Sequence, residues 1–198
     1  MDDIVKQALA KWPNVPHCYG WLALDARGNW RMRDERAQHF NLPGDKLNNA
    51  ALVAFITRNY AADERGCWYF QNGPQRVYVQ LEATPYIVRT DPTVGWRLHT
   101  GAPLGALEEV LLTETGALVS RSGEVVAQLD DRDFADVLPR LQLDGATVAD
   151  DVLLEWIEGQ AQGALSLDGV PVQRIAADQL AARFGYVSVP TSPTAADQ

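Results

Sequence analysis

GCWYFQNGPQRVYVQLEATPYIVR, residues 66–89, is the most informative stretch of this sequence. Its aromatic and β-branched side chains are typical of strands on a pleated, half-buried surface. Asn72-Gly73 predicts a tight turn between two strands, and Thr84-Pro85 separates the second strand from a third, shorter one. The stretch therefore predicts an antiparallel hairpin followed by a short strand.

The residues on either side of this hairpin predict further short elements. The spacing of apolar residues favours helices over residues 3–12 and 46–60, and a turn signal at Asp25 to Gly28 favours a hairpin over residues 20–33. After the hairpin we expect a strand over residues 95–99. Residues 101–105, GAPLG, are typical of a connector, and we place the domain boundary there.

The second half of the chain has a similar order of expected elements. We expect strands over residues 109–113, 117–120 and 124–129, helices over 134–141 and 150–157, a hairpin over 164–175, a helix over 177–184 and a last strand over 186–189. The closest local match aligns Leu22-Ala23-Leu24-Asp25 with Leu111-Leu112-Thr113-Glu114, and the Asn72-Gly73 turn with Asp168-Gly169. The pattern indicates an internal duplication, although hairpins beside a helix also recur by chance.

Each half therefore predicts an antiparallel sheet packed against a helix, which is an α+β fold rather than a parallel doubly wound one. We expect two similar small domains, at residues 1–100 and 106–189. The remaining residues, 190–198, are expected to be a disordered tail.

The composition restricts the partners and the compartment. The chain of 198 residues has a formal net charge of -9, so we expect no nucleic-acid binding and no docking on anionic lipid. The acidic start and the lack of a long apolar run predict neither a secretion signal nor a membrane span. Two cysteines, Cys18 and Cys67, are too few for a disulfide framework, and cytoplasm is the simplest compartment.

The common catalytic and cofactor motifs are absent from the sequence. It has no phosphate-binding glycine loop and no nucleophile elbow, and we expect no cofactor. His17 and Cys18 near Cys67 would make a zinc site only if the fold brought them together, and the simpler reading is structural. The acidic pairs Asp130-Asp131 and Asp150-Asp151 stand where helices begin and are interpreted as caps.

One face of the central hairpin carries the candidate binding residues. Strand alternation puts Tyr69, Arg76 and Tyr78 on one side, together with Arg31 or Arg33, while Trp68 and Phe70 face the core. If that side is exposed, it offers the residue types that dominate protein interfaces. Packing of tyrosine rings against arginine stems is the alternative reading.

The order of three motifs resembles an uncharacterised proteobacterial family of about 200 residues. The motifs are Ala26-Arg27-Gly28-Asn29-Trp30, a helix with Leu52 and Phe55, and the strand that ends in Leu81-Glu82-Ala83-Thr84-Pro85. The resemblance covers residues 20–130 and departs from the family where Arg27-Gly28 replaces Asp-Gly and where the 34–45 loop is longer. It implies repeated β-β-α-β-β units, no established activity and no functional residues to carry over. A signalling or regulatory role is implied for relatives at the level of fold alone.

The leading hypothesis is a non-catalytic cytoplasmic binding or regulatory module. Tyr69, Arg76 and Tyr78 would hold a protein partner or a second copy of the chain. The rival is a small-molecule-binding protein or hydrolase whose cleft lies between the halves, with Arg97 and His99 binding an anionic ligand. A structural subunit of a larger assembly is a third possibility, and the sequence does not identify a ligand.

Overall fold

The computed structural model describes residues 1–193 of the chain. These residues form two compact units. Unit 1 comprises Met1–Ala83 together with the chain from Gly185 onward, and unit 2 comprises Thr84–Phe184. The N-terminal and C-terminal segments of the chain thus belong to the same unit.

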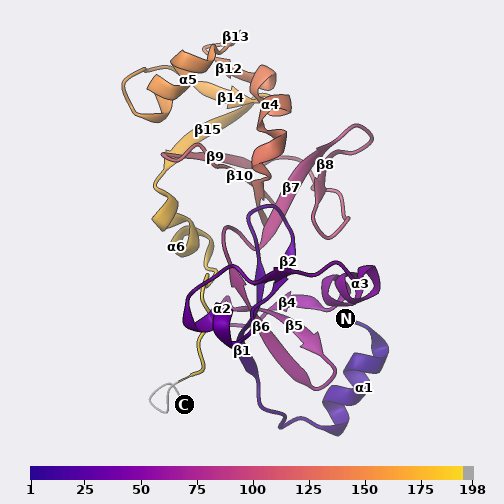
Figure 1. Cartoon of the computed structure of the whole chain (residues 1–198). Coiled ribbons are helices and arrows are strands. Elements are labelled where there is room, and N and C mark those ends of the chain that lie inside the picture. Colours follow the sequence, from indigo (N-terminus) through magenta and orange to yellow (C-terminus); the bar gives the residue numbers. More distant parts are fainter. Residues whose placement is uncertain (194–198) are drawn as a thin grey trace. The chain divides into compact units, whose positions relative to one another are not determined.

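Unit 1 contains three helices and six strands among the described residues (Figure 1). In chain order they are α1 (Asp3–Lys11), β1 (Cys18–Leu24), β2 (Trp30–Met32), α2 (Glu35–His39), β3 (Asp45–Lys46), α3 (Ala50–Arg58), β4 (Tyr60–Ala62), β5 (Trp68–Asn72) and β6 (Gln75–Leu81).

Unit 2 is richer in strands. Its elements are β7 (Tyr86–Asp91), β8 (Gly95–Leu98), β9 (Glu109–Thr113), β10 (Leu118–Ser122), β11 (Val125–Leu129), η1 (Asp131–Asp133), α4 (Phe134–Val137), η2 (Leu138–Arg140), β12 (Leu141–Leu143), β13 (Ala146–Thr147), α5 (Asp150–Ile157), β14 (Leu165–Leu167), β15 (Val170–Ile175), η3 (Ala177–Gln179) and α6 (Leu180–Phe184).

The two sheets share an order of six strands. Sheet 1 runs β4-β5-β6-β1-β2-β3, and sheet 2 contains β12-β14-β15-β9-β10-β11 as a continuous part. In both, a hairpin pairs in parallel with another hairpin, through β1 and β6 in unit 1 and through β9 and β15 in unit 2. Sheet 2 adds β13 at one edge and β7-β8 at the other. The expected α+β fold with two similar units is confirmed, and parallel pairing joins the expected hairpins.

Each sheet buries one face against a helix. In unit 1 the ring of Phe55 on α3 meets that of Phe70 on β5 edge-on at 5.4 Å, and Ile56 is buried beside them. In unit 2 the cluster around Val137 of α4 includes Val110 and Leu112 of β9. Apolar area removed from water on these faces supplies the main stabilisation of each unit.

The boundary expected at residues 101–105 lies within unit 2. The Leu98 N–H donates to the Ala102 carbonyl at 2.8 Å, and the Leu104 N–H donates to the Trp96 carbonyl at 2.9 Å. The segment therefore folds back on β8 as part of the same unit. The glycines and the proline mark a turn here, which composition alone does not distinguish from a linker.

Two expected helices are shorter in the structure. The helix expected over residues 46–60 begins at Ala50, where the side chain of Asn49 caps it by accepting the Leu52 N–H at 2.9 Å. The residues at its expected ends, Asp45–Lys46 and Tyr60, pair in the sheet instead. Likewise, the helix expected over residues 134–141 ends before Leu141, which is the first residue of β12. The expected helix over 177–184 is confirmed as η3 followed by α6.

The C-terminal segment packs along sheet 1. Val187 forms a parallel bridge with Cys67, and the Leu81 N–H donates to the Ser188 carbonyl at 2.8 Å. Pro190, the first residue of the expected disordered tail, is buried. Residues 194–198 of that tail lie outside the described residues.

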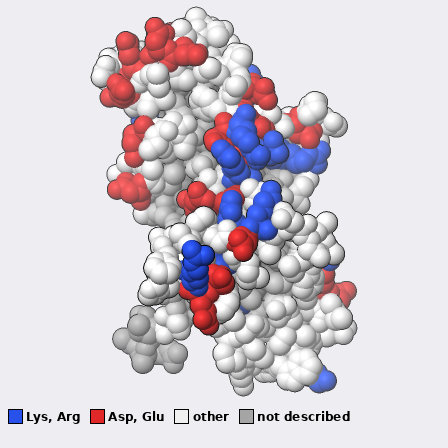
Figure 2. All heavy atoms as spheres, in the orientation of Figure 1, with Lys and Arg blue, Asp and Glu red and all other residues white. Residues whose placement is uncertain are grey.

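The acidic pairs interpreted as helix caps differ: the Asp130 side chain caps η1 by accepting the Arg132 N–H, whereas α5 has Ala149 at its N-cap position and no side-chain cap bond within the described residues. Figure 2 shows acidic side chains over the part of unit 2 that carries α5, which begins with Asp150 and Asp151. Cys18 and Cys67 are free thiols. Residues 1–193 contain no group of three metal-ligating side chains and no helix long and apolar enough to cross a bilayer.

Candidate functional site

Tyr69, Arg76 and Tyr78 share one face of sheet 1, as strand alternation predicts. Tyr69 and Tyr78 are paired across β5 and β6, and their rings meet edge-on at 5.8 Å. The Arg76 guanidinium lies 4.5 Å from the centre of the Tyr69 ring. Tyr69 is 6% and Tyr78 is 2% exposed, so the exposed surface required by the binding hypothesis is not present at the tyrosines, and the alternative of tyrosine rings packed with an arginine side chain describes them.

Residues distant in sequence bury the two tyrosines. The Tyr19 ring stacks on Tyr78 with a centroid separation of 4.5 Å, and Val187 packs on the same cluster. The Tyr78 hydroxyl donates to the Asp63 carboxylate at 2.9 Å. Burial raises the pKa of Tyr78, and the accepting carboxylate beside it adds to this effect. This part of the face is therefore a packed aromatic cluster.

Arg97 and His99 lie in unit 2, and each is held by its own neighbours. The Arg97 guanidinium pairs with the Asp91 carboxylate at 2.6 Å and also donates to the Gly101 carbonyl. His99 Nδ1 accepts the Ile87 N–H at 3.2 Å, and burial lowers the pKa of the imidazole to about 4. A neutral imidazole at pH 7 gives no charge with which to attract an anion.

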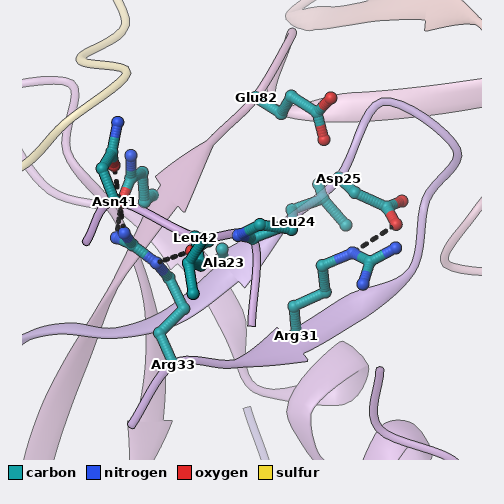
Figure 3. Close-up of a pocket in the computed structure, with 10 residues that line it drawn as sticks. Ala23, Leu24, Asp25, Arg31, Arg33, Asn41, Leu42 and Glu82 are labelled. Atoms are coloured by element: carbon teal, nitrogen blue, oxygen red, sulfur yellow. Dashed lines mark hydrogen bonds and ion pairs between the residues drawn. The ribbon is translucent and has the colours of Figure 1, made fainter. Parts of the chain in front are cut away.

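Further along the same face of sheet 1, a pocket of about 360 Å³ opens (Figure 3). We call it the arginine pocket. Its lining comprises Ala23, Leu24, Asp25, Arg31, Arg33, Asn41, Leu42, Pro43, Gln80 and Glu82. The part of the face that carries Arg31 and Arg33 therefore contains the pocket. The part that carries Tyr69 and Tyr78 is filled by packed side chains.

The first wall of the arginine pocket is the turn between β1 and β2. The Asp25 carboxylate accepts the Asn29 N–H at 2.7 Å and the Arg27 N–H at 3.0 Å, which fixes the turn. It also pairs with the Arg31 guanidinium at 2.7 Å. Burial of Asp25 would raise its pKa, but the bonds from Asn29 and Arg31 outweigh burial and hold that pKa below its usual value.

The second wall is the loop between β2 and β3, and Arg33 holds it in place. The Arg33 guanidinium donates to the carbonyls of Leu42 at 3.1 Å and Ala37 at 3.3 Å, and to Asn41 Oδ1 at 3.1 Å. It also donates to Gln80 Oε1. All four acceptors are uncharged oxygens, and Arg33 is only 6% exposed.

Backbone conformation makes this loop specific to its sequence. Gly44 has a φ of +80°, and a Cβ there would lie 2.3 Å from the Met32 carbonyl oxygen. Asn41 also has a positive φ, of +49°. Asn tolerates this conformation better than most residues, and Gly tolerates it best. The Asp34 side chain caps α2 within the same loop by accepting the Ala37 N–H at 2.7 Å.

Several polar atoms in the arginine pocket are available to an occupant. Within residues 1–193, Arg31 Nη2 and Gln80 Nε2 have no hydrogen-bond acceptor, and Glu82 Oε1 has no donor. The other Glu82 oxygen accepts the Ala26 N–H at 3.1 Å. The pocket therefore offers donors and one carboxylate oxygen in a partly apolar recess.

Unit 1 also has an apolar pocket of about 310 Å³ on the opposite face of sheet 1, beside α3. Cys18, Trp21, Met32, Leu52 and Phe55 are among its lining residues. Cys18 therefore lies on a different face from Cys67, which packs with Tyr69 and Tyr78. The separation also removes the zinc site considered for His17, Cys18 and Cys67, in agreement with the lack of such a cluster within residues 1–193.

Sequence reasoning found the arginines of this face and missed its cavity. The signal that was available is the loop itself, with an Asp34 cap and Pro43-Gly44 close to two alternating arginines. Gln80, on β6, and Glu82, one residue past the end of that strand, alternate in the same way. The sequence pattern does not predict the path of the loop between β2 and β3, because that path depends on the hydrogen bonds of Arg33.

The comparisons with known proteins identify the family. The model of DUF2944, described as "Protein of unknown function (DUF2946)", matches residues 1–191. The chain belongs to this family. The expected membership of a family without known function is thus confirmed, and no curated protein matches the chain.

Two solved structures resemble this member of the DUF2944 family. A DUF1285 family protein from Silicibacter pomeroyi DSS-3 has 16% identity and a TM-score of 0.49, over 91% of this chain and 98% of that chain. A DUF1285 family protein from Shewanella baltica OS155 has 14% identity and a TM-score of 0.39, over 59% of this chain and 88% of that chain.

Proposed function

We propose that this protein is a non-catalytic binding module that holds a small anionic molecule, with a carboxylate or a similar oxyanion, in the arginine pocket. The observation that carries the proposal is the charge of Arg33. The guanidinium is buried, and none of its hydrogen-bond acceptors is charged. Hydrogen bonds to neutral oxygens satisfy four of its five N–H groups and leave its positive charge without a paired carboxylate.

The electrostatics of the pocket favour an anion beside Arg33. The Asp25 carboxylate, which lines the pocket, is already bonded to Arg31 and to the turn. An oxyanion beside Gln80 and Arg33 would gain Coulomb energy at reduced dielectric and would accept the open Gln80 Nε2 donor. The volume of about 360 Å³ is at the small end of ligand sites in proteins.

The same residues favour binding over catalysis. The lining includes no serine, threonine, cysteine, lysine or histidine that could act as a nucleophile or as a proton carrier near pH 7. Arginine does not release its proton in proteins, and the lowered pKa of Asp25 makes that carboxylate a weak base.

Thermal unfolding in the presence of small anions tests this proposal. Wild-type protein is heated with acetate, propionate, butyrate, succinate or phosphate at constant ionic strength. A ligand at ten times its Kd adds about 1.4 kcal/mol to the unfolding free energy. For a chain of this length that corresponds to a rise in Tm of roughly 3–5 °C.

The Ala23→Leu variant is designed to fill the pocket without removing a charge. Ala23 lines the pocket, so the larger side chain should abolish the ligand-dependent rise in Tm. Ala54→Leu, at an exposed position of α3, is the matched control and should keep it. Failure of every anion to raise Tm, or an equal rise in the Ala23→Leu variant, would refute the proposal.

A further inference from the structure

The arginine pocket has opposite charges at its two ends. Figure 3 shows the Arg33 guanidinium beside Asn41 at one end, and the Arg31 guanidinium beside Asp25 at the other. The Asp25–Arg31 pair is neutral as a whole. The remaining charges of the lining are the positive charge of Arg33 at one end of the pocket and the negative charge of Glu82.

Glu82 is held at the end of the pocket that carries Asp25. One of its carboxylate oxygens accepts the N–H of Ala26, the residue that follows Asp25 in the turn. Its other oxygen has no donor within residues 1–193. A carboxylate fixed by one backbone bond with a free oxygen suits a cationic donor.

Gln80 lies on β6 and Glu82 one residue past its end, and their spacing along the chain sets the separation between the two charged ends. Gln80, which accepts from Arg33, and Glu82 are two residues apart and lie on the same face. Successive residues on one face of a strand are about 6.6 Å apart. A ligand that spans from Gln80 to Glu82 thus needs its two polar groups several bonds apart.

Resting on the proposed function, we infer that the ligand is a small amino carboxylic acid whose carboxylate lies at Arg33 and Gln80 and whose ammonium lies at Glu82. A simple carboxylate satisfies the positive end and leaves the Glu82 oxygen without a donor. A simple amine satisfies Glu82 and leaves the Arg33 charge uncompensated. Only a molecule with both groups matches both ends.

Binding isotherms for a homologous series test this inference. Calorimetric titration at low ionic strength compares glycine, β-alanine, 4-aminobutyrate and 6-aminohexanoate with butyrate and butylamine. We expect 4-aminobutyrate to bind at least tenfold more tightly than butyrate. Glycine should bind more weakly than 4-aminobutyrate, because its two charges are too close together to reach both ends.

The Glu82→Gln variant isolates the ammonium site. Glutamine keeps an oxygen for the Ala26 N–H, so the turn is preserved while the charge is lost. The preference for 4-aminobutyrate over butyrate should fall to about onefold, with butyrate binding retained. Glu64→Gln, at an exposed position of unit 1 outside the pocket, should leave the preference unchanged.

The outcomes separate this inference from the proposed function. If butyrate and 4-aminobutyrate bind equally to wild-type protein, the zwitterion is wrong and the anion site stands. If the preference survives in Glu82→Gln, the ammonium lies elsewhere and the inference is likewise wrong. If no member of the series binds, both the inference and the proposed function are overturned.

Discussion

The two sheets have the same six-strand order but differ at corresponding positions of one face. In unit 1, Ala23 pairs with Arg31 on one side and with Gln80 on the other. In unit 2, Leu111 holds the corresponding position and pairs with Val119 and with Gln173. The face is polar and hollowed in unit 1, whereas Leu111 is 1% and Val119 is 0% exposed.

The connection after the second strand gives the pocket on this face of unit 1 its second wall. Residues 33–44 link β2 to β3 and form a wall around Arg33. In unit 2 only Gly123 and Glu124 link β10 to β11, and they line a different hollow with the salt-bridged Glu109 and Arg121. The comparison teaches that the shared strand order supplies a scaffold, and that a single longer loop beside alternating arginines creates a candidate site.

The largest effect is expected from transferring the arginine of unit 1 to unit 2. Val119→Arg puts a guanidinium at a fully buried position, without the carboxylate that Asp25 provides for Arg31. An uncompensated buried charge costs about 3–5 kcal/mol. Equilibrium unfolding in guanidinium chloride should show at least about 3 kcal/mol less stability.

The reciprocal variant is the control for this prediction. Arg31→Val removes a half-buried arginine and leaves Asp25 with its donors from Asn29 and Arg27. The loss should be smaller than for Val119→Arg, about 2 kcal/mol, since one hydrogen bond to the Asp25 carboxylate and one to the Gly44 carbonyl are removed. Equal losses in the two variants would mean that the two faces have the same environment.

An intermediate effect is expected from exchanging the central side chains. Leu111→Ala removes a fully buried leucine and should cost about 3 kcal/mol, within the range of about 2–5 kcal/mol for such changes. Ala23→Leu adds volume where the arginine pocket provides space. It should cost at most about 1.5 kcal/mol in the same unfolding measurement. A larger loss for Ala23→Leu than for Leu111→Ala would contradict the described pocket.

Local sequence patterns predicted the hairpins and their turns well. Gly73-Pro74, directly after Asn72, and Asp168-Gly169 do separate paired strands, since glycine readily supplies the positive φ that such turns require. The alignment of the halves was wrong by one residue. Asp25 corresponds to Thr113 rather than to Glu114, because each accepts the N–H that closes its turn, from Asn29 and from Ala117 respectively.

Long-range packing limited the prediction of the site. Alternation correctly put Tyr69 and Tyr78 on one face, but it carries no information about what covers that face. Tyr19 and Val187 do so, and the latter is more than a hundred residues away in sequence. The arginine pocket escaped prediction for the same reason, since Arg33 folds its loop through backbone carbonyls that any residue could supply.

The two units are also expected to differ in how their stability responds to acid. His99 of unit 2 has a pKa of about 4 in the folded chain, below the value near 6.5 of an unfolded histidine. Its contribution to stability is thus present above about pH 6.5 and is lost as the pH falls towards 4, where the unfolded chain binds the extra proton. Asp25 of unit 1 also has a lowered pKa, so its contribution is lost only at lower pH, below the value near 3.9 of an unfolded aspartate.

The His99→Asn variant isolates the contribution of the imidazole. Asn Oδ1 can accept the Ile87 N–H that His99 Nδ1 accepts, and it does not titrate. Between pH 7 and pH 5 the wild-type protein should lose at most about 2 kcal/mol more unfolding free energy than the variant. Urea unfolding at each pH measures the unfolding free energy of both proteins. The titration of the carboxylates affects both proteins alike and cancels in the difference between them. Parallel stability curves for the two proteins over this range would show that His99 is free to take up a proton in the folded chain, and unit 2 would then share the acid response of unit 1.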